Sequence, residues 1–120
     1  MTQRSGRDLI DAAKTRIREV SVNDVQAMQA RGEPAVYVDV REPNEWNLGR
    51  LPQAILIPRG TLETTVEQRA PREATVVLYC AGGNRSALAA DTLQQMGYDK
   101  VVSMAGGFRA WVDAGGTVDG

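Results

Sequence analysis

TVVLYCAGGNRS, the stretch from residue 75 to residue 86, contains a strand, a glycine-rich loop and the start of a helix in direct succession. Its first five residues are apolar and mostly β-branched, do not alternate with polar residues, and are too few for a helix. Runs of this kind are typical of strands buried on both faces of a parallel sheet. Ser86 then opens a helix that the pattern ends at Gly97.

Similar apolar runs occur at residues 35–40 and 100–104, and more weakly at 54–58. Helical patterns lie between or beside them, among them Val22, Val25 and Met28 after a Ser-Val-Asn-Asp capping box, and Phe108, Trp111 and Val112 near the end. Strands separated by helices imply right-handed crossovers. We therefore predict one α/β domain with a central parallel sheet flanked by helices on both faces.

The domain is expected to span residues 20–115. Residues 1–19 are predicted to form a helical extension packed on it, because apolar residues recur there at spacings of three and four: Leu9, Ile10, Ala13, Ile17 and Val20. Residues 116–120 are predicted to form a flexible tail.

The composition of the chain argues against several classes of partner. The 120 residues carry 14 basic and 15 acidic side chains, a net charge of -1, which offers no bulk attraction to nucleic acid or to an anionic membrane. Apolar stretches are far shorter than the roughly 20 residues of a membrane span, and the first residues lack the apolar core of a signal peptide. We expect a cytoplasmic protein.

One cysteine and no histidine exclude an internal disulfide, a Cys/His metal site and a Cys-His catalytic pair. No metal or cofactor is expected.

The single cysteine, Cys80, lies at the end of the predicted strand and precedes a loop expected to bind an anion: Ala81, Gly82, Gly83, Asn84, Arg85 and Ser86. Backbone N–H groups at a helix start favour negative charge, and the two glycines permit close approach to a ligand. This environment can lower the pKa of a thiol and so replace the missing histidine base. The alternative, an inert cysteine before an ordinary turn, does not explain why these residue types occur together.

A thiolate held in this way could attack the outer sulfur of a donor, and the same N–H groups would then hold the resulting persulfide. Arg85 supplies a planar cationic fork suited to an oxyanion donor. Asp39 ends the predicted strand at 35–40, so it is expected near Cys80 at the carboxyl edge of the sheet.

Three motifs resemble the rhodanese family of thiosulfate sulfurtransferases, over a match from about Ser21 to Trp111. They are the loop that begins at Cys80, the segment Asp-Val-Arg-Glu at 39–42 with Glu-Trp at 45–46, and Met-Ala-Gly-Gly-Phe at 104–108 with Trp111. The resemblance implies a rhodanese-like domain with Cys80 as the persulfide carrier. It also implies that Asp39 and Arg41 brace the loop, Asp39 by accepting backbone N–H bonds. Arg41 would either pair with Glu42 or Glu45 or line the entrance as a second anion contact.

Two positions depart from the family's Gly-His-Ile-x-Gly-Ala segment: Arg50 stands in place of the usual histidine and Gln53 in place of a glycine. We expect these departures to affect local packing rather than sulfur chemistry. Trp46 and Trp111 are expected to pack in the core or at its rim. Gly106-Gly107 is expected to turn the chain into the last helix beside the loop.

The resulting hypothesis is a sulfurtransferase that moves sulfane sulfur from a donor such as thiosulfate to cyanide or a thiol through a persulfide on Cys80. A sulfur relay that exchanges persulfide with another protein, or a non-catalytic partner-binding module, remains an alternative. A Cys-dependent phosphatase is a weaker one, because such loops place five residues between Cys and Arg, whereas four separate Cys80 from Arg85.

Overall fold

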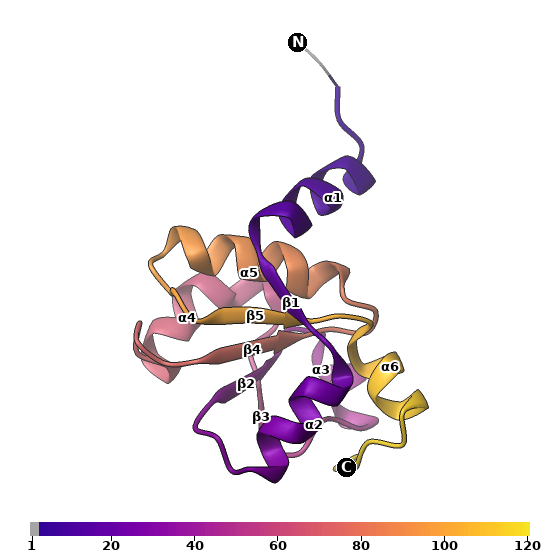
Figure 1. Cartoon of the computed structure of the whole chain (residues 1–120). Helices are drawn as coiled ribbons and strands as arrows, with labels where there is room; N and C mark the ends of the chain where they lie inside the picture. Colours follow the sequence, from indigo (N-terminus) through magenta and orange to yellow (C-terminus); the bar gives the residue numbers. More distant parts are fainter. Residues whose placement is uncertain (1–2) are drawn as a thin grey trace.

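The computed structural model describes residues 3–120 (Figure 1). Five parallel strands form its centre. In chain order they are β1 (Arg18–Val20), β2 (Val36–Asp39), β3 (Ala54–Leu56), β4 (Val76–Tyr79) and β5 (Val101–Met104). Their spatial order is β1-β5-β4-β2-β3, and each neighbouring pair is parallel. The predicted parallel sheet is confirmed, with β4 in its middle.

Helices cover both faces of the sheet, as predicted. Helices α4 (Leu62–Arg69) and α5 (Asn84–Gln95) pack on one face, and α2 (Val22–Ala30) and α6 (Gly107–Asp113) pack on the other. The remaining helices are α1 (Gly6–Arg16), the short α3 (Pro43–Asn47) and the 3-10 turn η1 (Arg59–Thr61). The outcome is an α/β three-layer domain.

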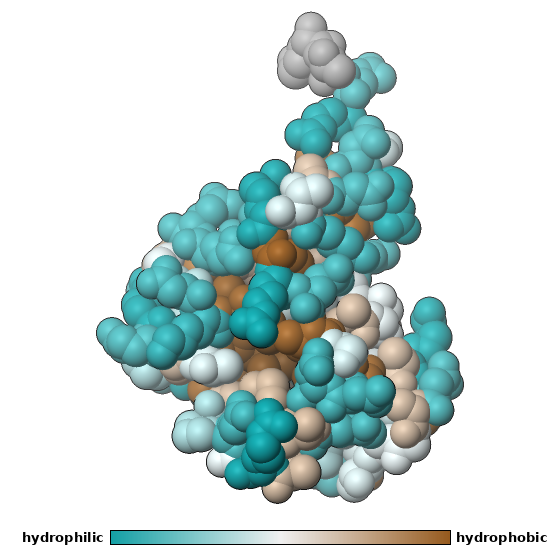
Figure 2. Space-filling model, in the orientation of Figure 1, coloured by the Kyte–Doolittle hydropathy of each residue, from teal (hydrophilic) through white to brown (hydrophobic). Residues whose placement is uncertain are grey.

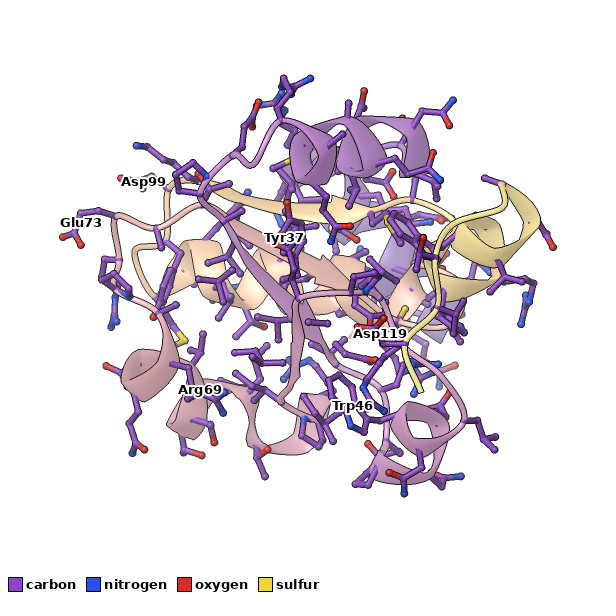
Figure 3. The ribbon with its side chains drawn as sticks, turned by 90° about the horizontal axis from the view of Figure 1, so that it is seen from below. Tyr37, Trp46, Arg69, Glu73, Asp99 and Asp119 are labelled. Carbon is purple, nitrogen blue, oxygen red and sulfur yellow. The ribbon has the colours of Figure 1, made fainter. Side chains whose placement is uncertain are left out.

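Side chains of the central strands alternate between two cores. Val38 and Leu78 are fully buried toward α4 and α5, whereas Tyr37 and Val77 point to the α2 and α6 side. Figure 3 shows Tyr37 between the sheet and α2. Because both faces are buried, apolar residues occupy consecutive positions, which explains why the sequence shows continuous apolar runs.

The N-terminal prediction needs a correction. Helix α1 ends at Arg16 and is followed by strand β1, whose Arg18 lies opposite Val102 of β5, so the helical spacing does not continue to Val20. The predicted boundary after residue 19 therefore falls inside a strand of the sheet. Helix α1 contacts α5 through buried Ala13 and through Arg16, which donates two hydrogen bonds to Asp91 at 3.0 and 2.8 Å. Beyond this contact, α1 projects from the domain (Figure 1).

Other element boundaries were predicted with mixed success. The capping box of α2 is confirmed, since Ser21 and Asp24 exchange hydrogen bonds at 3.0 Å. Helix α5 begins at Asn84, two residues before the predicted start. Helix α4 was not predicted, although its buried Leu62 and Val66 have helical spacing.

The chain end and the two unusual positions lie close together. The predicted tail is anchored, because Asp119 exchanges two backbone hydrogen bonds with Arg50, at 3.0 and 2.9 Å. The Arg50 guanidinium lies 4.5 Å from the centre of the Trp46 ring, and Figure 3 shows Trp46 and Asp119 in the same region. Gln53 has φ of 68°, a backbone conformation that strains glutamine more than it would strain glycine. Glycine is the residue that the family segment has at this position.

Apolar side chains are also visible at the surface. Figure 2 shows them gathered over β5 and β4, above α2. A hollow of about 360 Å³ in this part of the molecule is lined by apolar and charged residues, among them Val20, Met28, Val102, Arg18 and Arg31. Among residues 3–120, no helix has the length and apolar character needed to cross a membrane.

Candidate active site

Cys80 lies at the carboxyl edge of the sheet. It follows the last residue of β4, and Asp39, the last residue of β2, is paired in register with Tyr79. The expectation that Asp39 and Cys80 lie at neighbouring strand ends is confirmed. Cys80 is 1% exposed and belongs to the buried core on the α4 and α5 side. The thiol is therefore enclosed by the core and is not open to solvent.

Three groups of the loop and of α5 converge on the sulfur. The backbone N–H of Gly83 donates to Cys80 Sγ at 3.1 Å and that of Ser86 at 3.4 Å. The Ser86 hydroxyl lies 3.5 Å from Sγ, so it can accept from the thiol or donate to the thiolate. Gly83 has φ of 101°, a left-handed conformation, and a Cβ there would lie 3.1 Å from the backbone N of Gly106, so glycine fits this position. The loop thus surrounds Sγ with hydrogen-bond donors.

These contacts change the acidity of the thiol. Burial of Cys80 raises its pKa, but hydrogen bonds from the Ser86 hydroxyl and from the amides of Ser86, Gly83 and Gly82 outweigh burial. The pKa of Cys80 consequently lies below that of an ordinary cysteine. The thiolate, which is the nucleophilic form, is favoured without a histidine.

A second buried hydroxyl supports the first. Ser103 of β5 is fully buried, and its Oγ lies 2.8 Å from Ser86 Oγ. Because either hydroxyl can donate, the Ser86 proton can turn toward a thiolate while Ser103 donates to Ser86. Ser103 was missed from the sequence, where a serine inside an apolar strand was the available signal.

Helix α6 holds the other side of the loop. The N–H of Phe108 donates to the Cys80 carbonyl at 2.7 Å, and the N–H of Arg109 donates to the Ala81 carbonyl at 3.1 Å. Gly107 has φ of 60°, and a Cβ at this position would overlap the Cys80 carbonyl oxygen and lie 2.7 Å from that of Ala81. The predicted tight turn beside the loop is confirmed, and it fixes the carbonyl groups next to the cysteine.

Arg85 and Glu45 form a two-pronged ion pair. Arg85 donates to the two carboxylate oxygens of Glu45 at 2.8 and 3.0 Å, and Glu45 also accepts the Glu42 N–H at 2.9 Å. The hydrogen bonds from Arg85 lower the pKa of Glu45 to about 2. The cationic fork expected to face a donor is thus directed at Glu45, a partner that the sequence reasoning did not assign to Arg85.

Asp39 and Arg41 form a buried brace beneath α6. Asp39 accepts the backbone N–H of Arg41 at 2.9 Å, as expected, and also receives its guanidinium at 2.8 to 3.0 Å. Arg41 donates further to the Gly49 carbonyl at 2.7 Å and lies 4.4 Å from the centre of the Phe108 ring. It is 4% exposed, so the predictions that it pairs with a neighbouring glutamate or lines the entrance are wrong. Arg41 also lies 5.7 Å from the centre of the Tyr79 ring, so the pair contacts both α6 and the residue that precedes Cys80.

The remaining loop residues supply backbone rather than side-chain chemistry. Gly83 is the N-cap of α5, Asn84 is its first residue, and Gly82 exposes its backbone toward Arg109. Within residues 3–120, no three His, Cys, Asp or Glu side chains come together as a metal site would require.

Comparison with known proteins finds sequence relatives of this chain. Residues 21–114 match the model of the rhodanese-like domain family. A protein of Allochromatium vinosum named sulfurtransferase is 31% identical over 99 residues, which are 82% of this chain and 92% of that protein.

Solved structures share the whole fold. A protein of unknown function from Rhodopseudomonas palustris, described as a possible tyrosine phosphatase, is 37% identical with a TM-score of 0.90, covering 99% of this chain and 97% of its own. A thiosulfate sulfurtransferase from Pseudomonas aeruginosa is 26% identical with a TM-score of 0.84, covering 92% of this chain and 21% of its own.

Proposed function

The chain belongs to the rhodanese-like domain family, and from this premise we propose that it transfers sulfane sulfur through a persulfide on Cys80. The donor is a small sulfur-containing anion such as thiosulfate, and the acceptor is a thiol or cyanide. The observation that carries the proposal is the set of donors around Sγ: two backbone N–H groups and a serine hydroxyl. These groups suit a thiolate and, after reaction, the anionic outer sulfur of a persulfide.

The first half-reaction is a displacement at sulfur. The Cys80 thiolate attacks the outer sulfur of thiosulfate, a new S–S bond forms, and the old S–S bond breaks as sulfite leaves with its electron pair. Both negative charges of the donor are conserved, because sulfite is a dianion and the persulfide takes over the charge of the thiolate. The amides of the loop favour this step since they stay in place while the charge moves from one sulfur to the next.

The second half-reaction needs an external acceptor. Cys80 is the only cysteine in the chain, so no internal thiol can resolve the persulfide. Cyanide attack on the outer sulfur gives thiocyanate and returns the thiolate, and thiol attack gives a new persulfide on the acceptor. If the acceptor is a protein thiol, the same chemistry makes this chain a sulfur relay.

Intact-mass spectrometry tests the proposal. Brief incubation with thiosulfate should add one sulfur atom to the protein, and cyanide should remove it. Cys80→Ser should gain no sulfur, because a hydroxyl is not nucleophilic enough to form the corresponding adduct. Absence of a cyanide-labile adduct after thiosulfate and after polysulfide would contradict the proposal. Hydrolysis of an aryl phosphate that depends on Cys80 would then support the phosphatase alternative.

A further inference from the structure

The charged side chains around the cysteine loop are mostly compensated by a partner. Arg85 is held by Glu45 through two hydrogen bonds, and Arg41 is buried against Asp39. An incoming anion would therefore meet two cations whose charge is already balanced by a carboxylate. A source of positive charge without such a partner would attract the anion more strongly.

Arg109 is such a source. It lies in the first turn of α6, two residues after Gly107, and its side chain is exposed. Within the part of the chain that the structure describes, no carboxylate lies within 4.0 Å of its guanidinium. Its charge is thus available to a ligand.

The position of Arg109 is fixed relative to the loop at two points. Its backbone N–H donates to the Ala81 carbonyl at 3.1 Å. Its Nη1 lies 3.8 Å from the place that a Cβ on Gly82 would occupy, so the guanidinium stands over the part of the loop that has no side chain. Because Gly82 leaves this space open, a donor bound there would meet backbone on one side and a free cation on the other.

On the premise that Cys80 transfers sulfur as proposed, we infer that Arg109 binds the charged end of an anionic donor, while Arg85 and Glu45 hold the loop in shape. For thiosulfate, this end is the sulfonate group that departs as sulfite. Arg109 therefore determines the preference for anionic over neutral donors, and it is a donor-binding residue on an element that carries no part of the sulfur-holding loop.

The test compares two alkylating probes that differ in charge. Iodoacetate is an anion and iodoacetamide is neutral, and both react with the same Cys80 thiolate. In Arg109→Gln, the rate ratio of iodoacetate to iodoacetamide should fall on the order of threefold at low salt, because one unit charge a few ångströms away is lost. The KM for thiosulfate, a dianion, should rise on the order of tenfold for the same reason. Arg18→Gln, which removes another exposed arginine, at the opposite end of the sheet, is the matched control and should leave both quantities unchanged.

The outcomes separate this inference from the proposed function. An unchanged probe ratio in Arg109→Gln, or an equal fall in Arg18→Gln, would overturn the role of Arg109. A fall confined to Arg109→Gln supports an anion-binding role even if the unmodified protein forms no persulfide, and in that event only the sulfur-transfer proposal fails.

Discussion

Replacement of Gly107 by alanine should distort the loop that begins at Cys80, although Gly107 itself lies outside this loop. Gly107 has φ of 60°, and a Cβ there would overlap the Cys80 carbonyl oxygen. The overlapping atoms are backbone, which has no rotamer to change, so α6 must move away from the loop. The hydrogen bonds from Phe108 and Arg109 to the two loop carbonyls, 2.7 and 3.1 Å long, would lengthen or break.

The expected loss of stability has two parts. An alanine in the left-handed conformation costs about 1 kcal/mol. Two weakened backbone hydrogen bonds add about 0.5 to 1.5 kcal/mol each. The sum, about 2 to 4 kcal/mol, is smaller than the free energy of unfolding of a typical domain, about 5 to 15 kcal/mol, so the variant should still fold.

Gly32→Ala is the matched control, because Gly32 has a similar φ of 67° but no atom within 4 Å of the added Cβ. Urea unfolding of both variants should place Gly107→Ala at least 1 kcal/mol below Gly32→Ala. The alkylation rate of Cys80 should change only in Gly107→Ala. Equal stabilities would refute the reasoning, since they would mean that α6 does not press on the loop.

Three further predictions concern side chains around the thiol. Ser86→Ala should raise the pKa of Cys80, because it removes a hydroxyl donor but leaves the amides; the pH profile of iodoacetamide alkylation should move to higher pH, and an unchanged profile would argue against this donor. Ser103→Ala should raise the pKa of Cys80 by a smaller amount. It should cause no further rise in a Ser86→Ala background, because Ser103 acts through Ser86. Additive shifts of the pKa in the double variant would show that the two serines act independently. Glu45→Gln should free Arg85 and speed iodoacetate relative to iodoacetamide. With the pKa of Glu45 at about 2, the stability from its ion pair with Arg85 is present above the ordinary glutamate pKa and is lost only as the pH falls toward 2, which acid unfolding of the unmodified protein and Glu45→Gln can check.

Much of the central sheet can be predicted from the sequence because burial on both faces leaves a local signal. The runs that became β2, β4 and β5 are apolar at consecutive positions, and Asp39 and Cys80 mark where two of them end. Parallel strands place these ends at one edge, so the neighbourhood of the cysteine follows from the fold class.

Strand β1 shows where this reasoning fails. Its residues Arg18 and Glu19 are exposed, and it exists because β5 offers a free edge that local sequence does not reveal. The apolar residues on either side happen to keep helical spacing, which favoured a longer helix.

The same limit applies to the partners in the site. Glu45 reaches Arg85 across 40 residues and Ser103 reaches Ser86 across 17. Each of these contacts depends on how α3, β5 and α5 pack rather than on any local pattern. The residue types of Glu45 and Ser103 indicate a role in the site only once their hydrogen-bond partners, Arg85 and Ser86, are known.

The separation of Cys80 from Arg109 has an evolutionary consequence. The proposed nucleophile, Cys80, belongs to a buried strand end, where almost any substitution disturbs the core, whereas Arg109 occupies an exposed position on a short helix. On the proposed function and the proposed role of Arg109, selection can therefore alter the charge of that position, and with it the choice of donor, without changing the residues that activate the sulfur. On the same premise, a lineage of such proteins could acquire new sulfur sources by single surface substitutions while its reaction stays the same.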